Sequence, residues 1–413
     1  MKGKIFTIIL LWLSTVGMAA ADNPARKTVF TGGHEREYLV YTPRNVQTAG
    51  PEGILVALHG FNRTMYNFFE EYSITSIADA LNYIIVAPQA LREQDQWVGG
   101  MAEVFALFLG KNIKLDAVWG CGLKVRIDTF GSIELLEVEL NSSVDDVDFI
   151  RTVVERTLAE RSMPAENIFL AGTSMGGYMA YQFATRQPVR LSGVISIAGS
   201  MGLNIKDMDG RFQTPVCDFH STTDEVVPYA GSYREGGNVV VALARSKEDV
   251  LDYWAETNGT GAPVTEKVDY YPSTTGITVD KIIRPHPENE VVHYRMNGAT
   301  HGYFFRRENG DCMDYVEEIG KFIASHSTNH AGVAEDVAGR QITVSPNPAC
   351  DVVRFGCASG DVSVYDLTGR LVLSASFRSG SLDVSSLKRG LYVFHVRSEG
   401  RVHTEKVLLT TRY

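Results

Sequence analysis

The chain has 413 residues, and at roughly 150 residues per domain this length predicts two to three domains. Hydrophobic residues make up 44% of it and charged residues 21%, which excludes a disordered or low-complexity chain. The net charge of −10 argues against a general nucleic-acid binder, because such proteins neutralise phosphates with an excess of basic residues. From Gln341 onward the balance is reversed, with 9 basic and 6 acidic residues, which suggests two separately evolved parts.

The first residues have the pattern of a secretory signal peptide. Lys2 and Lys4 precede an apolar run over residues 5–16, and Ala19-Ala20-Ala21 forms an A-x-A cleavage site. The run is shorter than the roughly 20 residues that span a bilayer, so cleavage is favoured over a retained membrane anchor. We therefore expect residues 1–21 to be removed on export, with no transmembrane segment left in the exported chain.

Residues 22–326 are predicted to form an α/β domain. Short apolar runs alternate with amphipathic stretches there, which is typical of a mostly parallel sheet flanked by helices. The expected strands are residues 37–41, 54–58, 83–87, 168–171, 193–197, 216–219 and 291–295. The expected helices are residues 67–81, 144–161, 175–186, 247–257 and 313–325, with Ser143 and Ser246 as the N-caps of two of them.

The segment from Leu91 to Asn141 fits this alternation poorly. It contains an expected helix over residues 102–111 and two alternating stretches, residues 124–128 and 133–135, on either side of Gly131. Alternating stretches around a glycine predict a hairpin arm beside the sheet. The sequence leaves open whether this arm is a surface elaboration or a lid over a binding site.

The remainder of the chain has a different composition. Residues 327–340 are small and polar, as in a linker. Residues 341–413 contain short alternating strands at 341–345, 361–366, 371–374 and 391–396, separated by turn sequences. This spacing predicts a small C-terminal β-sandwich.

Cysteine usage gives little support to a metal site or to a disulfide framework. Five cysteines follow the signal, so at least one stays unpaired in an oxidising compartment. Cys350 and Cys357 flank a predicted strand that spans roughly 23 Å, far more than the ~7 Å that a disulfide allows between Cα atoms. The sequence has no C-x-x-C pair, and we expect no metal.

The strongest chemical signal is Gly172-Thr173-Ser174-Met175-Gly176-Gly177, between a predicted strand and a predicted helix. A nucleophile on a sharp strand-to-helix turn has strained backbone angles, and flanking glycines remove side chains that would collide there. The alternative is an ordinary tight turn. We predict that Ser174 is a nucleophile.

A serine nucleophile needs a base, and the base needs a carboxylate that orients it. Asp224, in the loop after the strand over residues 216–219, is the predicted carboxylate, and Asp218 and Glu225 are the alternatives. His301, in the loop after the last predicted strand of the domain, is the predicted base.

Other histidines are expected to be structural or solvated. His293 lies inside a predicted strand, His286 lies between prolines, and His59 precedes a predicted loop. In the same loop the backbone N–H of Phe61 is predicted to form an oxyanion hole together with the N–H of Met175, at the start of the helix after Ser174.

These segments resemble the motif set of secreted α/β-hydrolases similar to polyhydroxybutyrate depolymerases and to feruloyl and acetylxylan esterases. The resemblance extends over about Lys27 to His326 and is carried by residues 58–60, 171–177, 220–229 and 298–301. It implies that Ser174, Asp224 and His301 form a catalytic triad. The chain departs from this group in its expanded segment over residues 91–141 and in the bulky Phe61.

The C-terminal part resembles the sorting domain of the type IX secretion system. The resemblance covers about Gln341 to Tyr413 and is carried by residues 345–348, 364–370, 382–387 and 390–392. It implies that residues 341–413 bring the protein to the secretion machinery, from the periplasm to the medium or the cell surface. The alternative is a carbohydrate-binding or adhesive β-module.

Together these features predict a secreted serine esterase that needs no cofactor. Its substrate is expected to be an ester, either free or within a polymer, such as a feruloyl or acetyl ester of plant polysaccharide or a short-chain polyester. A serine peptidase on the same fold and a non-catalytic surface binding protein are the alternatives. The sequence identifies neither the acyl nor the alcohol group, because pocket shape decides both.

Overall fold

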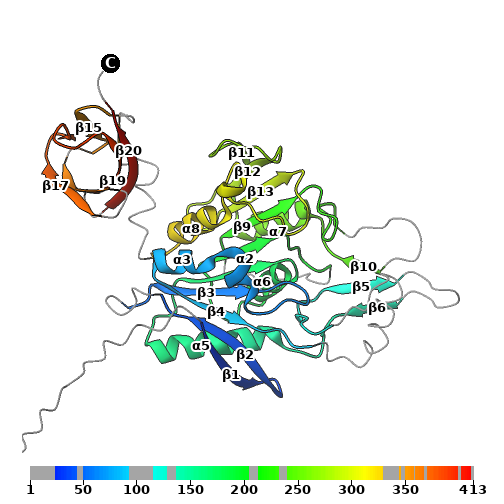
Figure 1. Cartoon of the computed structure of the whole chain (residues 1–413). Coiled ribbons are helices and arrows are strands. Elements are labelled where there is room, and N and C mark those ends of the chain that lie inside the picture. The colour runs from blue at the N-terminus through cyan, green and yellow to red at the C-terminus, as the bar shows by residue number, and fades with distance from the viewer. Residues whose placement is uncertain are drawn as a thin grey trace, which may run out of the picture. The chain divides into compact units, whose positions relative to one another are not determined.

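The computed structural model of the chain is shown in Figure 1. It describes residues 24–43, 50–92, 115–127, 136–203, 213–231, 240–328, 344–345, 349–357, 359–366, 370–398 and 401–410. The chain divides into two compact units, Met1–Thr328 and Asn329–Tyr413. The predicted signal peptide, the expected helix over residues 102–111 and most of the predicted linker lie outside the described residues. The predicted domain bounds therefore stay a prediction.

The first unit is built on a ten-stranded sheet with the order β1-β2-β4-β3-β7-β8-β9-β13-β12-β11. The six central strands run parallel, and antiparallel pairs form both edges. The strands are β1 (Ala25–Thr31), β2 (His34–Tyr41), β3 (Gly53–Leu58), β4 (Tyr83–Pro88), β7 (Ile168–Thr173), β8 (Gly193–Ile197), β9 (Val216–Ser221), β11 (Val264–Val268), β12 (Thr278–Arg284) and β13 (Val291–Asn297). This confirms the predicted mostly parallel sheet.

Helices cover both faces of this sheet (Figure 1). One face packs against α5 (Asp146–Arg161), α6 (Met175–Arg186) and α7 (Lys247–Asn258), and the other against α2 (Asn67–Tyr72), α3 (Ile74–Leu81) and α8 (Tyr315–Ser325). Successive side chains of a strand point to opposite faces, so in β3 Ile54 and Val56 join one hydrophobic cluster while Leu55 and Ala57 join the other. Burial on both faces explains why the central strands are continuous apolar runs.

The helix predicted over residues 67–81 is two helices. Ser73, between α2 and α3, has φ 44° and ψ 35°, in the left-handed region. A left-handed residue interrupts the ladder of helical hydrogen bonds, and the second helix starts in a new direction. The apolar pattern of this segment continues through the break, which is why the sequence predicted one helix.

Only one of the two predicted N-caps is correct. Ser246 caps α7, where its Oγ accepts the Asp249 N–H at 3.1 Å. Ser143 does not cap α5, because the N-cap is Asp145, whose carboxylate accepts the N–H of Asp148 at 3.0 Å. Aspartate is as good an N-cap as serine, and its charge also interacts favourably with the helix dipole.

A hairpin arm is present in the described residues. β5 (Lys124–Ile127) pairs antiparallel with β6 (Leu136–Glu139), while the predicted stretch over residues 133–135 lies outside the described residues. A third strand, β10 (Val240–Leu243), pairs with β5 to form a separate three-stranded sheet. The sequence did not predict β10, since its partner lies far away along the chain.

The second unit is a small β-sandwich, as predicted. One sheet consists of β14 (Val344–Ser345), β15 (Val352–Phe355) and β18 (Ser381–Asp383). The other consists of β17 (Leu371–Phe377), β16 (Gly360–Tyr365), β19 (Gly390–Ser398) and β20 (Arg401–Leu409). Phe355 of one sheet and Phe377 of the other have ring centroids 4.3 Å apart within a shared hydrophobic cluster. The unit therefore has a core of its own.

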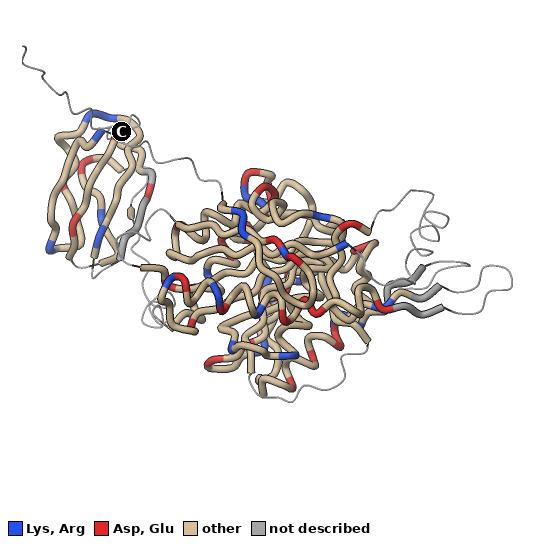
Figure 2. Tube along the Cα trace, turned by 90° about the horizontal axis from the view of Figure 1, so that it is seen from below, with Lys and Arg blue, Asp and Glu red and all other residues tan. Residues whose placement is uncertain are grey.

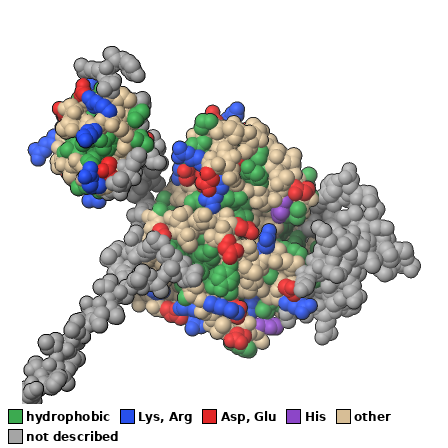
Figure 3. Space-filling model, in the orientation of Figure 1, with side chains coloured by type: hydrophobic (Ala, Val, Ile, Leu, Met, Phe, Trp, Pro, Cys, Tyr) green, Lys and Arg blue, Asp and Glu red, His purple; other side chains and the backbone are tan. Residues whose placement is uncertain are grey.

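Charges of both signs are spread along the described part of the first unit (Figure 2). On the face seen in Figure 3 they are interspersed with hydrophobic and other side chains, and neither sign gathers into a large patch. Across the described residues we find no helix with the length and apolar character needed to cross a membrane.

All five cysteines lie in the described residues and are free thiols. Cys121, Cys217 and Cys312 are buried, and burial raises the pKa of the Cys217 thiol well above its usual range. A buried thiol that stays protonated is a poor nucleophile, so Cys217 is a core residue.

Candidate active site

Ser174 lies at the turn between β7 and α6. Its φ of 52° and ψ of −120° are rare for a residue with a side chain, as predicted for a strained turn. The Ser174 N–H donates to the carbonyl of Ile197, on the neighbouring strand β8, at 2.7 Å. A Cβ on Gly176 would lie 2.0 Å from the Leu58 carbonyl oxygen, so only glycine lets α6 approach β3 this closely. This packing fixes the turn that carries the serine hydroxyl.

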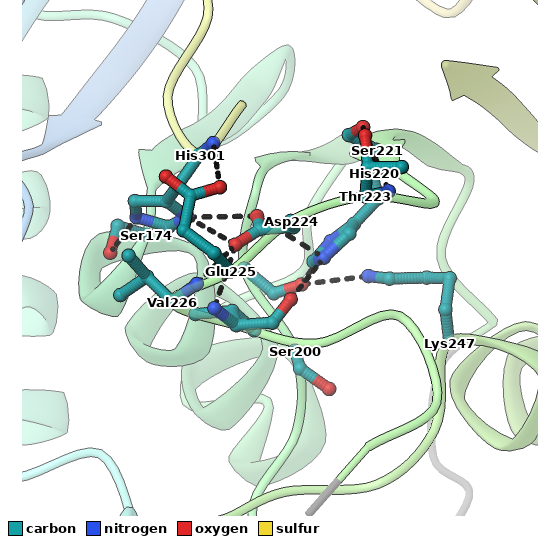
Figure 4. A network of polar contacts seen from close by, with 12 residues as sticks. Ser174, Ser200, His220, Ser221, Thr223, Asp224, Glu225, Val226, Lys247 and His301 are labelled. Carbon is teal, nitrogen blue, oxygen red and sulfur yellow. Dashed lines mark hydrogen bonds and ion pairs between the residues drawn. The ribbon is translucent and has the colours of Figure 1, made fainter. Parts of the chain in front are cut away.

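His301 lies in the loop after β13 and contacts both of the other predicted triad residues (Figure 4). Its Nε2 is 3.0 Å from Ser174 Oγ, and its Nδ1 is 2.8 Å from Asp224 Oδ2. With the proton on Nδ1 donated to the carboxylate, Nε2 has a free lone pair that accepts the serine hydroxyl. The three residues thus form one continuous line of hydrogen bonds.

Asp224 lies in the turn after β9, and its carboxylate is fixed by backbone groups. Asp224 Oδ1 accepts the N–H of Val226 at 2.9 Å and that of Val227 at 2.8 Å. Burial acts to raise the pKa of the Asp224 carboxyl, but the hydrogen bond and charge of His301 act together with the hydrogen bond from the Val227 N–H and hold this pKa below its usual range. The carboxylate is therefore ionised at neutral pH and can stabilise a positive charge on the imidazole.

Asp218, the first alternative for the acid, belongs to a different cluster. Its buried carboxylate accepts hydrogen bonds from Lys247 Nζ, His293 Nδ1 and the Tyr181 hydroxyl, each at 2.8 Å. Burial opposes ionisation, but Lys247 and His293 hold the pKa of the Asp218 carboxyl well below its usual range. His293 is thus a structural histidine, as expected, and Asp218 is its partner.

Glu225, the second alternative, contacts the backbone of His301 and not its ring. Glu225 Oε2 accepts the His301 N–H at 3.2 Å from an exposed position. His286 accepts the N–H groups of Glu288 and Asn289 in a turn, which agrees with its expected structural character. Neither residue lies in the hydrogen-bonded line from Ser174 to Asp224.

Ser221 and Thr223 hold the loop of His301, a role that the sequence analysis missed. Ser221 Oγ donates to the Ala299 carbonyl at 2.7 Å, and Thr223 Oγ1 lies 2.8 Å from the same oxygen. Ala299 precedes His301 by two residues, so these hydroxyls connect the loop of the acid to the loop of the base. The cluster of hydroxyl residues before Asp224 was the available signal.

The predicted oxyanion loop lies directly against Ser174. A Cβ on Gly60 would be 3.5 Å from Ser174 Cβ, so Gly60, the residue before Phe61, borders the serine side chain. Among the described residues, neither the Phe61 N–H nor the Met175 N–H has an acceptor within hydrogen-bonding distance. Two free N–H groups beside a serine hydroxyl are what an oxyanion hole requires.

His59 is a buried support of this loop. Its Nδ1 donates to the Gly60 carbonyl at 2.8 Å, and its Nε2 accepts the Ala90 N–H at 3.1 Å. Burial lowers the pKa of His59 to about 4, so the ring is neutral at pH 7 and keeps this tautomer. Trp119 Nε1 in turn donates to the His59 carbonyl at 2.8 Å. Trp119 is fully buried, so this described part of the 91–141 segment is core and not a surface elaboration.

Two parts of the chain match known families. Residues 141–247, which contain both Ser174 and Asp224, match the model of the Phospholipase/Carboxylesterase family. The first unit has the α/β-hydrolase fold. Residues 343–410 match the model of the Secretion system C-terminal sorting domain, which supports a location outside the cell or on its surface. The chain therefore resembles carboxylesterases over residues 141–247 and secretion sorting domains over residues 343–410.

Individual relatives of the α/β-hydrolase are distant. Over 86 residues, 21% of this chain, it is 29% identical to NocK of Nocardia uniformis subsp. tsuyamanensis, which is named as an esterase, and the aligned part spans 25% of that protein's length. The structure of an acetyl xylan esterase from Aspergillus awamori has 13% identity and a TM-score of 0.43, and the alignment covers 69% of this chain and 97% of that one. The structure of an S-formylglutathione hydrolase from Agrobacterium tumefaciens has 13% identity and a TM-score of 0.40. That alignment covers 76% of this chain and 98% of the other.

Proposed function

We propose that this α/β-hydrolase is an exported serine carboxylic ester hydrolase with Ser174, His301 and Asp224 as its catalytic triad. The observation that supports the proposal most is the line of hydrogen bonds from the Ser174 hydroxyl through the His301 ring to the Asp224 carboxylate. Ser174 also lies on a strained strand-to-helix turn, which adds support, because backbone strain is common at a turn that presents a nucleophile.

In the first half of the reaction Ser174 Oγ attacks the carbonyl carbon of the ester. His301 Nε2 takes the hydroxyl proton as the Oγ–C bond forms, and Asp224 stabilises the resulting imidazolium. The carbonyl oxygen becomes an oxyanion that accepts hydrogen bonds from the N–H groups of Phe61 and Met175. When the oxyanion collapses, the alcohol leaves with the proton from His301 and the acyl group stays on Ser174.

In the second half water replaces the alcohol. His301 Nε2 removes a proton from the water as its oxygen attacks the acyl carbon, and the oxyanion forms again in the same place. Collapse breaks the bond to Ser174 Oγ, which recovers its proton from His301, and the carboxylic acid is released. Every atom and proton is accounted for by the ester, one water molecule and these side chains, so no cofactor takes part.

The substrate that we propose is a feruloyl or acetyl ester of plant polysaccharide, or a short-chain polyester. The support is the resemblance of the motifs around Ser174, Asp224 and His301 to those of secreted esterases and polyester depolymerases. Export through a type IX secretion system, after cleavage of a signal peptide, would bring the enzyme to polymers that cannot enter the cell. Residues 341–413 are the proposed contact with that machinery, and the match over residues 343–410 supports this.

The test combines labelling of Ser174 with a panel of substrates. A fluorophosphonate probe should modify the wild-type protein and fail to modify Ser174→Ala, and this variant should lose several orders of magnitude in kcat with an unchanged circular-dichroism spectrum. Short-chain, feruloyl and polyhydroxybutyrate esters should be compared with peptide anilides. Cleavage of anilides alone would indicate a peptidase, and a protein that neither reacts with the probe nor hydrolyses any ester would be a binding protein on a hydrolase scaffold.

A further inference from the structure

His220 is a buried histidine for which the proposed mechanism has no use, although it lies beside the triad (Figure 4). It is in β9, and its side chain is completely inaccessible to solvent. Its Nε2 is 2.7 Å from the Val227 carbonyl oxygen and 3.5 Å from Asp224 Oδ2, while its Nδ1 is 3.1 Å from the Gly199 carbonyl oxygen. The ring therefore lies between the turn of the acid and the loop after β8.

On one side the ring holds the turn that fixes the triad carboxylate. Val227 closes this turn, and its N–H donates to Asp224 Oδ1 at 2.8 Å. A hydrogen bond from His220 to the Val227 carbonyl therefore fixes the same residue whose amide orients Asp224. Without it, the turn would keep its bonds to Asp224 but lose this hydrogen bond to β9.

On the other side the ring faces a segment that packs against the nucleophile helix. A Cβ on Gly199 would lie 2.7 Å from Gly177 Cα, so the Gly199 loop and α6 are in close backbone contact. The Gly199 carbonyl also accepts Lys247 Nζ at 2.7 Å, and Lys247 is paired with Asp218 at 2.8 Å. His220 thus connects the acid turn to a rigid part of the core beside Ser174.

The protonation state of the His220 ring agrees with a role as a hydrogen-bond donor. Two carbonyl oxygens face its two nitrogens, but a neutral imidazole carries only one proton. Burial and the charge of Lys247 lower the pKa of His220 to about 4, although Asp218 and Asp224 act in the opposite direction. At neutral pH the single proton therefore lies on Nε2, which has the nearer acceptor, while the Gly199 carbonyl is occupied by Lys247.

We propose that His220 is a positioning residue for the triad acid, and that its Nε2–H bond to the Val227 carbonyl keeps Asp224 in line with His301. This inference rests on the proposed function, because it assumes that Asp224 is the acid. The residue does not touch the substrate, and its effect is transmitted through the 224–227 turn.

Two substitutions distinguish the roles of the two ring nitrogens of His220. In His220→Gln the side-chain amide nitrogen can replace Nε2 and donate to Val227, whereas in His220→Asn the shorter amide can replace only Nδ1. For the full-length protein on a soluble ester, we expect Gln to keep kcat within about threefold of wild type and Asn to lose roughly 10- to 100-fold, since misplacement by about 1 Å can cost that much. KM should change little in both variants, because the substrate is not contacted.

The pH profile distinguishes positioning from a purely structural effect. In His220→Asn the acid limb of kcat/KM should shift to lower pH, because a displaced carboxylate stabilises the imidazolium of the base less. His293→Gln is the matched control: it changes another buried histidine, which is bonded to Asp218 and Tyr229 and not to the acid turn. This control should lower the melting temperature without moving the acid limb.

Equal loss of kcat in the Gln and Asn variants, or an unchanged kcat and pH profile in a folded Asn variant, would overturn the proposal. If His220→Asn does not fold at the assay temperature, the Gln variant decides alone, and a folded Gln variant with kcat reduced about tenfold or more contradicts the inference. Activity that survives in Ser174→Ala would instead contradict the proposed function, so the two failures are distinguishable.

Discussion

Replacing Asp218 and Asp224 one at a time by asparagine should separate stability from catalysis. Both carboxylates are buried, and both accept a hydrogen bond from the Nδ1 of a histidine. Asp224 faces His301 and, through it, Ser174, whereas Asp218 faces Lys247 and His293 in the core. The same chemical change should therefore lower mainly the stability at Asp218 and mainly the catalytic activity at Asp224.

The size of each effect follows from the partners that remain. Asp218→Asn leaves the ammonium of Lys247, which is 1% exposed, without its counter-ion, and breaking a buried pair in this way costs about 3–5 kcal/mol of unfolding free energy. Asp224→Asn keeps an oxygen for the N–H groups of Val226 and Val227, so the loss of stability should be smaller. An amide cannot hold the imidazole in the required tautomer, and the corresponding change in a serine protease lowers kcat about 10⁴-fold.

Urea unfolding followed by circular dichroism, together with kcat on a soluble ester, measures both quantities. Asp218→Asn should unfold at markedly lower urea concentration and keep most of its kcat below that concentration. Asp224→Asn should be nearly as stable as wild type and nearly inactive. The reasoning is refuted if a folded Asp218→Asn variant is inactive while Asp224→Asn keeps more than about a tenth of wild-type kcat.

Three further changes test the loop, the acid response and the C-terminal unit. Gly60→Ala adds a methyl 3.5 Å from Ser174 Cβ and should lower kcat/KM about tenfold at an unchanged melting temperature. Gly176→Ala would place its methyl 2.0 Å from a carbonyl oxygen and should not give a folded protein. Equal melting temperatures and activities of the two variants would contradict this reasoning. The His59 pKa of about 4 means that its proton binds only to the unfolded chain between pH 6.5 and 4. As the pH falls through that window, His59 alone should therefore lower the unfolding free energy by roughly 3 kcal/mol. Urea unfolding of His59→Gln should show a flatter pH dependence than wild type, and an identical slope would refute the reasoning. A chain that ends at Asn329 keeps the hydrogen bond of Thr328 to Asn167 and should retain kcat/KM within about twofold of the full-length value. In the native host this shortened chain should stay in the periplasm. Its appearance in the medium would contradict the sorting role.

Much of the candidate site could be predicted because its signals are local. Ser174 is flanked by a buried strand, a helix and glycines within a few residues, and Asp224 and His301 follow buried strands in an order shared with known hydrolases. The structure brings all three within hydrogen-bonding distance, while their catalytic roles stay a prediction. The sequence favoured Asp224 but left Asp218 and Glu225 open, since the direction of each carboxylate depends on how the end of β9 turns.

The contacts of the supporting residues could not be predicted for the same physical reason. His220 contacts the Gly199 loop, Ser221 contacts Ala299, and Trp119 contacts His59, and each pair joins segments that are distant along the chain. A local pattern reports how a residue is buried but not which distant backbone group it will meet. Only the packing of β8, β9 and β13 side by side decides these contacts.

The sequence by itself determined the six central strands of the first unit, most of the helices that cover them, the small β-sandwich and the residues that can carry chemistry. It did so because hydrophobic periodicity, glycine pattern and turn composition depend only on near neighbours. Tertiary structure alone decided the break at Ser73, the pairing of β10 with β5 and the choice of Asp224 as the partner of His301. These features depend on long-range packing, in which one residue's environment is supplied by elements that the local sequence does not contain.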